Sequence, residues 1–269
     1  KTAFLGLVGD DPLGDLVRRQ VRAEGIDDRH LTVHPSRPTG VLVRDRRGFG
    51  ASRVTYHRTN SAGAALTPGD LTHGFLDGVR LLHLSGITPC LSPSAADAAT
   101  AAVAQARAAG VAVSLTLNYR RALGSAAQFR ATLRPLVAAS RIVVGTREEA
   151  MLLSEEPEPA EAAQALLDLG ADAVVLTAGA EGAACYRSKA PTLTHRGPTV
   201  SAPADTVGAG DAFAGGFLSS WLGGDDMAVA LRVAHACAAF CVAAVGDTQG
   251  LPDRGELTAL LESGDDQIR

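Results

Sequence analysis

The chain has 269 residues and a mass of 27.6 kDa, and 46% of its residues are hydrophobic while 20% are charged. This length and composition favour one large globular domain over two smaller ones. The 25 basic and 29 acidic residues give a net charge of −4 and a pI near 6.0, so the chain offers no positive field to nucleic acid or an anionic membrane. We therefore expect neither as a partner.

The sequence shows no pattern typical of a membrane span or a secretion signal. The longest apolar stretches, such as 111–117 and 173–176, fall well short of the ~18 residues that a membrane-spanning helix needs. No charged, then apolar, then small-residue leader is found, and the four cysteines have no CxxC spacing. These observations predict a protein of the reducing cytoplasm.

Apolar runs typical of strands alternate with helical patterns along most of the chain. The first unit is a run at 2–8, a turn at 9–12 and a helix at 13–24, with Asp11 and Pro12 at positions typical of an N-cap and a first helical residue. The same patterns predict strands at 81–84, 111–117, 141–144 and 173–177, and helices at 94–109, 148–153, 160–169, 212–222 and 227–245. Such alternation implies parallel βαβ units, and continuous apolar strands are typical of a sheet covered by helices on both faces.

The segment between Thr39 and Arg58 breaks this alternation. Two stretches with a period close to two, 40–45 and 52–58, are joined by a loop at 46–51 that contains Gly48 and Gly50. The pattern predicts a β-hairpin that stands apart from the main sheet. Such a hairpin can cover a site, pair with another subunit, or do both.

The segment 205–213, DTVGAGDAF, is a loop of small residues that runs directly into a helix. Gly208 and Gly210 permit backbone conformations closed to larger residues, so successive N–H groups around Ala209 can converge at the helix N-terminus, where the dipole favours anions. This pattern predicts a phosphate-binding loop. A carboxylate beside a phosphate is disfavoured by electrostatic repulsion unless it has a function there. Asp211 therefore indicates a base that accepts a proton from an attacking hydroxyl. The alternative is a tight turn with Asp211 as an ordinary first-turn acid.

The full string DTVGAGD resembles the C-terminal signature of the ribokinase-like (PfkB) carbohydrate kinases, and other landmarks follow in the family's order. The segment VGDDPLGD at 8–15 is similar to the family's early GxDxxG turn, and RPTG at 37–40 to the residues that lead into its lid. The segment 235–257 is similar to its last helix and adenine-side loop. The resemblance therefore covers nearly the whole chain.

The resemblance implies an α/β fold, a ribokinase-like three-layer αβα sandwich with a mainly parallel central sheet and a small β lid. It places the kinase core at 1–32 and 63–269 and the hairpin lid at 33–62. It also implies a segment ahead of Lys1 that holds the family's first strands, a substrate-side aspartate and a GG-x-x-x-N motif. Without such a segment the chain is a degenerate member of the family.

The resemblance further implies ATP and Mg²⁺ as cofactors. The segment LTAGAEGAACY at 176–186 looks like the strand-turn-strand near the family's nucleotide, and Glu148 stands at the glutamate of an NxxE motif that organises Mg²⁺ through water. The alternative for Glu148 is an ordinary acidic first helical turn. The implied nucleotide-binding residues are Thr177, Gly179, Glu181, Gly182, Gly208 and Gly210, and the implied catalytic residues are Asp211, Gly208, Ala209 and Gly210.

A second match concerns the substrate. The segment YHRTNSA at 56–62, followed by LTPGDL at 66–71, resembles a run of the 2-keto-3-deoxygluconate kinases. Tyr56 and Arg58 face the same side of a strand, and an arginine fork beside a tyrosine hydroxyl suits the carboxylate of a ketoaldonate. The alternative is a cross-strand pair on the lid surface.

The segment LNYR at 117–120 resembles the DxNxR segment of the same kinases. The resemblance implies that Asn118 and Arg120 contact the substrate or the transferred phosphate, together with Asp211. The alternative is a plain turn at the end of a strand. Two positions depart from the family pattern, because Thr116 stands where the family usually has Asp and Gly145 where it has Asn.

Together these features imply an ATP-dependent kinase that acts on a primary hydroxyl of a sugar acid, converting 2-keto-3-deoxygluconate to 2-keto-3-deoxy-6-phosphogluconate. The alternatives are a kinase for fructose or another neutral sugar, and a catalytically weak sugar- or nucleotide-binding member. A hairpin with exposed edges also predicts a homodimer that forms through the lid.

Two weaker patterns favour plain structural roles. Cys237 and Cys241 lie one helical turn apart near His235, but a fourth zinc ligand is lacking, so we expect buried apolar cysteines. The glycines at 6–14 have the wrong spacing for the dinucleotide motif GxGxxG, which disfavours a dehydrogenase.

Overall fold

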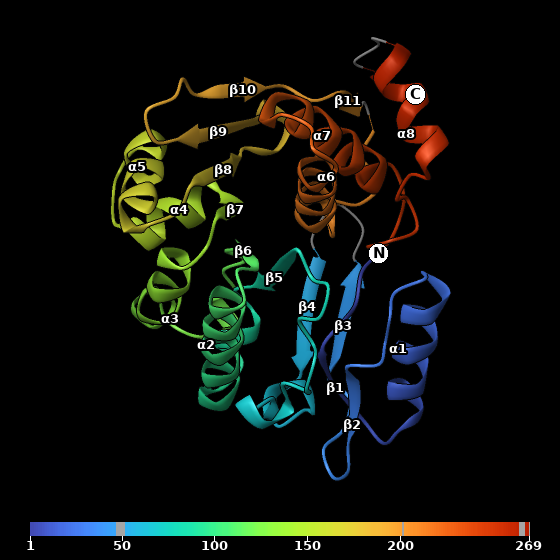
Figure 1. Cartoon of the computed structure of the whole chain (residues 1–269). Coiled ribbons are helices and arrows are strands. Elements are labelled where there is room, and N and C mark those ends of the chain that lie inside the picture. The colour runs from blue at the N-terminus through green and yellow to red at the C-terminus, as the bar shows by residue number, and fades with distance from the viewer. Residues whose placement is uncertain (47–51, 201, 264–266, 269) are drawn as a thin grey trace. The chain divides into compact units, whose positions relative to one another are not determined.

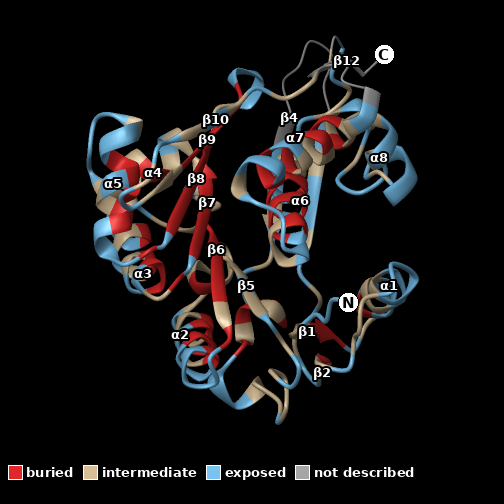
Figure 2. Ribbon diagram, turned by 45° about the horizontal axis from the view of Figure 1, so that its top comes forward, coloured by how far each residue is buried: buried red, intermediate tan, exposed pale blue. Residues whose placement is uncertain are grey.

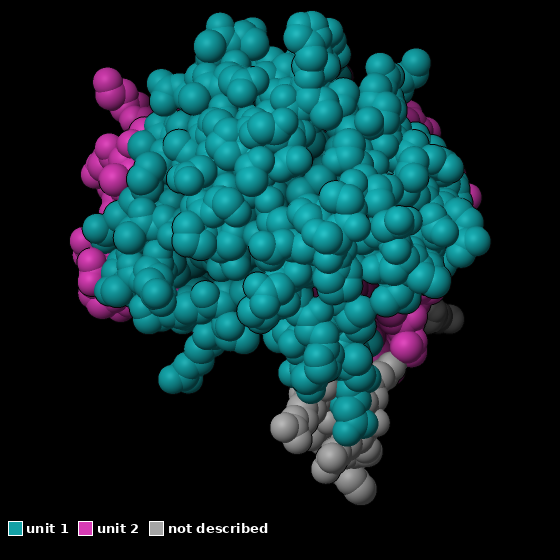
Figure 3. Space-filling model, turned by 90° about the horizontal axis from the view of Figure 1, so that it is seen from below, with its two compact units in different colours: residues 1–114, 118–139 teal, residues 115–117, 140–269 magenta. Residues whose placement is uncertain are grey.

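The computed structural model describes residues 1–46, 52–200, 202–263 and 267–268 (Figure 1). The chain divides into two compact units, each of which is described by itself (Figure 3). Unit 1 comprises residues 1–114 and 118–139, and unit 2 comprises residues 115–117 and 140–269. The expected kinase core (1–32 and 63–269) and lid (33–62) have boundaries that differ from those of the two units, so this division stays a prediction.

Unit 1 begins with β1 (Gly6–Gly9), α1 (Pro12–Ala23) and β2 (Leu31–His34). The two strands pair in parallel. Asp11 is the N-cap of α1 and accepts a hydrogen bond from the Gly14 N–H, which confirms the predicted cap. The predicted first strand starts later than expected, because Ala3 forms only an isolated bridge with Asp27.

The predicted β-hairpin is present in unit 1. Its strands β3 (Val41–Arg46) and β4 (Ser52–His57) pair antiparallel as a two-stranded sheet of their own. Leu42 and Val43 are 53% and 51% exposed, so the hairpin presents apolar surface to solvent. The joining loop predicted to contain Gly48 and Gly50 lies outside the described residues.

The remainder of unit 1 contains β5 (Leu81–Ser85), α2 (Pro93–Ala108), the first part of β6 (Ala112–Thr116) and α3 (Ala126–Ala138). The alanines at 95, 98, 102 and 106 lie on one face of α2 and are buried. Small side chains on this face let the helix pack closely, and Leu66 packs against it. α3 is not among the helices that the apolar patterns of the sequence predict.

Unit 2 carries β7 (Ile142–Thr146), α4 (Arg147–Ser154), α5 (Pro159–Leu169), β8 (Ala173–Thr177), β9 (Ala183–Arg187), β10 (Leu193–His195), β11 (Thr199–Val200), α6 (Ala209–Gly223), α7 (Met227–Ala243), α8 (Arg254–Ser263) and β12 (Gln267–Ile268). The short strands β11 and β12 pair in parallel. Fully buried side chains such as Leu166, Leu176 and Phe217 form its core.

The central sheet has the strand order β10-β9-β8-β7-β6-β5 and is mixed, mostly parallel. β7 and β8 are parallel, whereas β9 runs antiparallel to both β8 and β10. In unit 2, α4 and α5 lie on one face of the sheet and α6 and α7 on the other (Figure 2). The expected α/β fold, with helices on both faces of a mainly parallel sheet, is confirmed.

Within the described ranges, none of the helices is long and apolar enough to cross a membrane.

Candidate active site

The loop before α6 has the geometry of an anion-binding helix N-terminus. Gly208 is the N-cap with a φ of 84°, and Ala209, Gly210 and Asp211 form the first turn of the helix. A Cβ on Gly208 would lie 2.8 Å from the carbonyl oxygen of Asp247, so both the backbone conformation and the packing require glycine. The first N–H groups of an α-helix have no intrahelical acceptor, which makes a helix N-terminus suited to bind an anion.

Cys241 on α7 supports this loop from within unit 2. Its thiol donates weak hydrogen bonds to the carbonyl oxygens of Val207, at 3.5 Å, and Asp247, at 3.6 Å. Burial raises the pKa of the Cys241 thiol, and the charges of Asp247, Asp205 and Asp211 raise it further. The thiol therefore stays protonated and holds the loop, in agreement with the expected buried cysteine.

Asp211 is exposed on the first turn of α6. This position is compatible with the predicted base and with a plain first-turn acid, so the catalytic role stays a prediction. The sequence predicted Cys241 only as a buried cysteine, and it gave no sign that Cys241 and Asp247 support the loop, because no local motif links them to it.

Thr177 and the predicted nucleotide residues of the turn 179–182 lie at the carboxyl end of β8, at the edge where open α/β sheets bind ligands. Thr177 ends β8 and donates a hydrogen bond to the carbonyl oxygen of Gly145, at 3.3 Å. The turn that follows contains Gly179 and Glu181, and it ends at Gly182, which has a φ of 107°. A Cβ on Gly182 would overlap the carbonyl oxygen of His195, so this position also requires glycine.

Arg147 fixes the turn at Glu181. Its Nη1 atom donates to Glu181 Oε2 at 2.7 Å and thereby joins the first turn of α4 to the β8–β9 connection. Glu148 is the next residue of α4 and is exposed. The structure thus brings the predicted metal residue and the predicted nucleotide turn to one edge of the sheet, and sequence reasoning missed Arg147.

Gly145 departs from the family pattern because Leu117 occupies the space a side chain would need. A Cβ on Gly145 would lie 2.7 Å from Leu117 Cδ1, and Leu117 is fully buried. The Leu117 N–H also donates to the carbonyl oxygen of Val144 at 2.8 Å, which fixes the backbones together. The glycine is therefore a packing requirement of this chain.

We expect Gly145→Asn to lower the free energy of unfolding by about 1–3 kcal/mol, the cost of overpacking a filled core. The measurement is the midpoint of urea unfolding. In a Leu117→Ala background the added side chain has room, so the penalty should shrink. An equal penalty in both backgrounds would contradict the packing explanation.

In unit 1, the guanidinium of Arg58 lies over the ring of Tyr56. Its guanidinium carbon lies 4.1 Å from the centre of the Tyr56 ring, so the predicted pair does share one side of the hairpin. Its Nη2 atom is buried, and in the described part of the chain it has no hydrogen-bond partner. Burial, and secondarily the positive charge of Arg120, lower the pKa of Arg58. A bound anion would offset both the burial of the guanidinium and its repulsion by Arg120.

Asn118 and Arg120 follow β6 and line a cavity of about 340 Å³ in unit 1. Asn118 has a φ of 48°, and its Nδ2 atom donates to Ser85 Oγ at 3.1 Å. Arg120 donates to Asn118 Oδ1 at 3.3 Å and to the carbonyl oxygen of Tyr119 at 3.1 Å. These contacts orient the guanidinium beside the cavity. Thr116, the other departure from the family pattern, is buried and belongs to unit 2.

His235 is engaged in protein contacts. Its Nδ1 atom lies 2.9 Å from the carbonyl oxygen of Leu231 and 3.0 Å from His195 Nδ1. Burial lowers the pKa of His235 to about 4, so the ring is neutral near pH 7. These contacts give His235 a structural role behind α6, where Phe213 packs edge-on against it.

Comparison with known proteins identifies the family. Residues 1–254 match the model of the pfkB family carbohydrate kinases. A 2-dehydro-3-deoxygluconokinase from Bacillus subtilis (strain 168) is 31% identical over 265 residues, which cover 98% of this chain and 82% of that protein. The chain therefore belongs to the pfkB family and is a carbohydrate kinase.

Two solved structures of similar sugar kinases contain bound ligands. A fructokinase from Vibrio cholerae O395, bound to fructose, ADP and calcium, is 30% identical with a TM-score of 0.86, covering 97% of this chain and 85% of its own. A protein assigned as a ribokinase II from E. coli, in complex with ATP and Mg²⁺, is 25% identical with a TM-score of 0.90, covering 97% and 83%. These similarities confirm the ribokinase-like fold.

Proposed function

We propose that this kinase uses ATP to phosphorylate a primary hydroxyl of 2-keto-3-deoxygluconate, giving 2-keto-3-deoxy-6-phosphogluconate. The observation that carries this proposal is the buried Nη2 of Arg58, which has no hydrogen-bond partner among the described residues. Arg120 adds a second positive charge nearby. Two like charges gathered around an unsatisfied donor favour an acidic ligand. The resemblance to the 2-dehydro-3-deoxygluconokinase supports the same substrate under its other name.

Phosphoryl transfer requires mainly positioning and charge stabilisation from the protein. In the proposed mechanism Asp211 accepts the proton of the attacking hydroxyl, and the N–H groups of Gly208 to Gly210 stabilise charge on the transferred phosphoryl group. Thr177, Gly179, Glu181 and Gly182 would line the nucleotide site. Tyr56, Arg58, Asn118 and Arg120 would bind the substrate, the arginines at its carboxylate.

Glu148 fits a magnesium site. Its carboxylate is exposed at the carboxyl edge of the sheet and forms no ion pair within the described part of the chain. Magnesium binds few protein ligands directly and keeps several waters, so one carboxylate acting through water is sufficient. The ion would neutralise charge on the phosphates of ATP.

The second candidate is a kinase for fructose or another neutral sugar, which the fructose-bound relative favours. The test compares kcat/KM for 2-keto-3-deoxygluconate, fructose and ribose with ATP and Mg²⁺. We expect the acid sugar to have the highest value. Faster turnover of fructose would refute the acid-sugar assignment, and binding of a sugar without turnover would favour the catalytically weak member.

We also propose that the protein acts in the cytoplasm, where its four free cysteines stay reduced. A homodimer through the hairpin is a further proposal, because Leu42, Val43 and Val54 expose apolar surface there. Light scattering that gave the mass of a monomer at micromolar concentration would count against the dimer.

A further inference from the structure

The base of the hairpin is tied to the turn after β1 by a compact set of hydrogen bonds in unit 1. The Gly9 N–H donates to Thr39 Oγ1 at 2.9 Å. The Thr39 N–H donates to Asp11 Oδ2 at 2.7 Å, while Asp11 Oδ1 accepts from the Gly14 N–H at 2.8 Å. We call Gly9, Asp11 and Thr39 the latch.

The latch is tightly packed as well as hydrogen-bonded. A Cβ on Gly9 would lie 2.6 Å from the Thr39 nitrogen and 2.7 Å from the carbonyl oxygen of Arg37. A Cβ on Gly14 would overlap the carbonyl oxygen of Gly9. The N–H groups of Thr39 and then Gly14 lower the pKa of Asp11, so its carboxylate stays charged and keeps accepting both bonds near neutral pH. The turn and the segment that enters β3 therefore behave as one rigid piece.

The segment that follows the latch, up to β3, packs against Arg58 and the residues after it. Gly40 follows Thr39, and a Cβ on Gly40 would lie 3.3 Å from Arg58 Cβ. The Ala62 N–H donates to the carbonyl oxygen of Pro38 at 2.8 Å, and the Ser61 N–H donates to that of Arg58 at 3.1 Å. The segment before β3 and the segment after β4 are thus held together next to Arg58.

We propose that Thr39 is a positioning residue, which acts through the latch to set the guanidinium of Arg58 for the carboxylate of the sugar acid. The inference rests on the proposed function, because it assumes that Arg58 binds the acid group. Thr39 itself need not touch the substrate. Its hydroxyl supplies the acceptor that joins the hairpin base to the turn after β1.

The test uses Thr39→Val, which keeps the shape and the backbone N–H but removes the acceptor for Gly9. We expect the KM for 2-keto-3-deoxygluconate to rise about fivefold to tenfold, the scale of one lost hydrogen bond with an orphaned donor. The kcat and the KM for ATP should stay within about twofold, since only substrate positioning changes. Thr39→Ser keeps the hydroxyl and should restore the parental KM.

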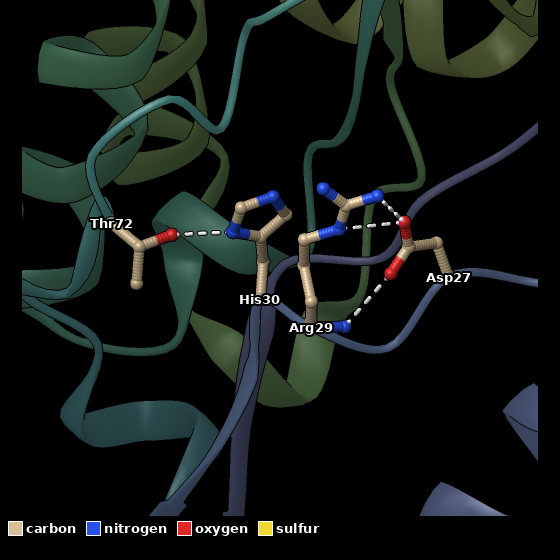
Figure 4. Close-up of polar contacts among 4 residues, drawn as sticks. All are labelled: Asp27, Arg29, His30 and Thr72. Atoms are coloured by element: carbon tan, nitrogen blue, oxygen red, sulfur yellow. Dashed lines mark hydrogen bonds and ion pairs between the residues drawn. The ribbon is translucent and has the colours of Figure 1, made fainter.

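The matched control is Thr72→Val. Thr72 Oγ1 lies 2.6 Å from His30 Nδ1 (Figure 4). This substitution therefore removes another partly buried hydroxyl contact of unit 1, between two residues that belong neither to the hairpin strands nor to the latch. Its KM for the acid sugar should equal that of the parent. An equal rise in both variants would mean that general loosening, rather than the latch, affects binding, and would refute the proposal.

A double-mutant cycle separates the latch from the proposed function. In an Arg58→Met background Thr39→Val should leave the KM for the acid sugar unchanged, because the residue it positions is gone. If Thr39→Val raised the KM for the acid sugar by the same factor in the Arg58→Met background as in the parent, the latch proposal would be wrong. It would also be wrong if Arg58→Met alone raised this KM while Thr39→Val alone left it at the parental value. If Arg58→Met alone leaves the KM unchanged, the proposed function fails and the latch proposal falls with it.

Discussion

Replacing Asp211 by Asn should lower the turnover number by roughly 10²-fold or more, the scale of a lost general base. Asn is nearly isosteric, so the change removes the proton acceptor and leaves the first turn of α6 intact. The affinity for ATP should hold or improve, because the substitution removes a negative charge next to the proposed phosphate site. The measurements are kcat and the dissociation constant of ATP for the variant and the parent.

Asp226→Asn is the matched control for this prediction. Asp226 is the N-cap of α7, and its Oδ1 atom accepts from the N–H groups of Ala228 and Val229, both at 2.9 Å. Asn caps a helix about as well as Asp, so activity and melting temperature should barely change. If Asp211→Asn also kept its turnover within about threefold of the parent, Asp211 would be a first-turn acid and not the base.

The parts of the fold that could be predicted are those with strong local signals. The strands 141–144 and 173–177 correspond to β7 and β8, because both are continuous apolar runs in a sheet covered on both faces. Asp11 and Pro12 marked the start of α1 correctly. The hairpin was recognised because its period of two contrasts with the helical patterns around it.

Elements with weak or conflicting signals were missed. α3 contains Pro135, which argues against a helix in the sequence, yet Ser125 and Gln128 form a capping box that could have revealed its start. α6 begins at Ala209, earlier than predicted, because Gly208 adopts the positive φ that ends the loop. β2 and β10 were also missed, since each is only a few residues long.

The candidate site shows the same division between local and distant signals. The loop at 205–211 could be located from sequence because glycine spacing and the following helix are local features. Contacts such as Cys241 with Val207, Arg147 with Glu181 and Leu117 with Gly145 join segments far apart in the chain. Pairings of this kind depend on the register of strands and helices, which a single sequence does not reveal.

The second large effect is expected for Arg58→Met. Loss of a hydrogen bond to a charged group costs about 1.5–3 kcal/mol, so the KM for 2-keto-3-deoxygluconate should rise roughly 10-fold to 100-fold. The kcat/KM for fructose should change little, because a neutral sugar gives the guanidinium no charge to bind. The measurement is the ratio of kcat/KM for the acid sugar to that for fructose, which should fall steeply.

Stability distinguishes this effect from damage to the fold. Arg58 Nη2 makes no hydrogen bond within the described residues, so replacing it should leave the melting temperature unchanged or raise it. Arg187→Met is a suitable control, because Arg187 on β9 also has a buried nitrogen, Nε, without a partner in the described ranges. The control should keep the parental preference for the acid sugar.

Arg58→Lys tests whether the charge or the fork of donors matters. Lysine keeps the positive charge but binds a carboxylate through one ammonium group, without the bidentate geometry of arginine. Its KM for the acid sugar should therefore lie between those of the parent and Arg58→Met. If all three proteins shared one KM for the acid sugar, Arg58 would not bind its carboxylate, and the buried guanidinium over Tyr56 would be a structural contact of the hairpin.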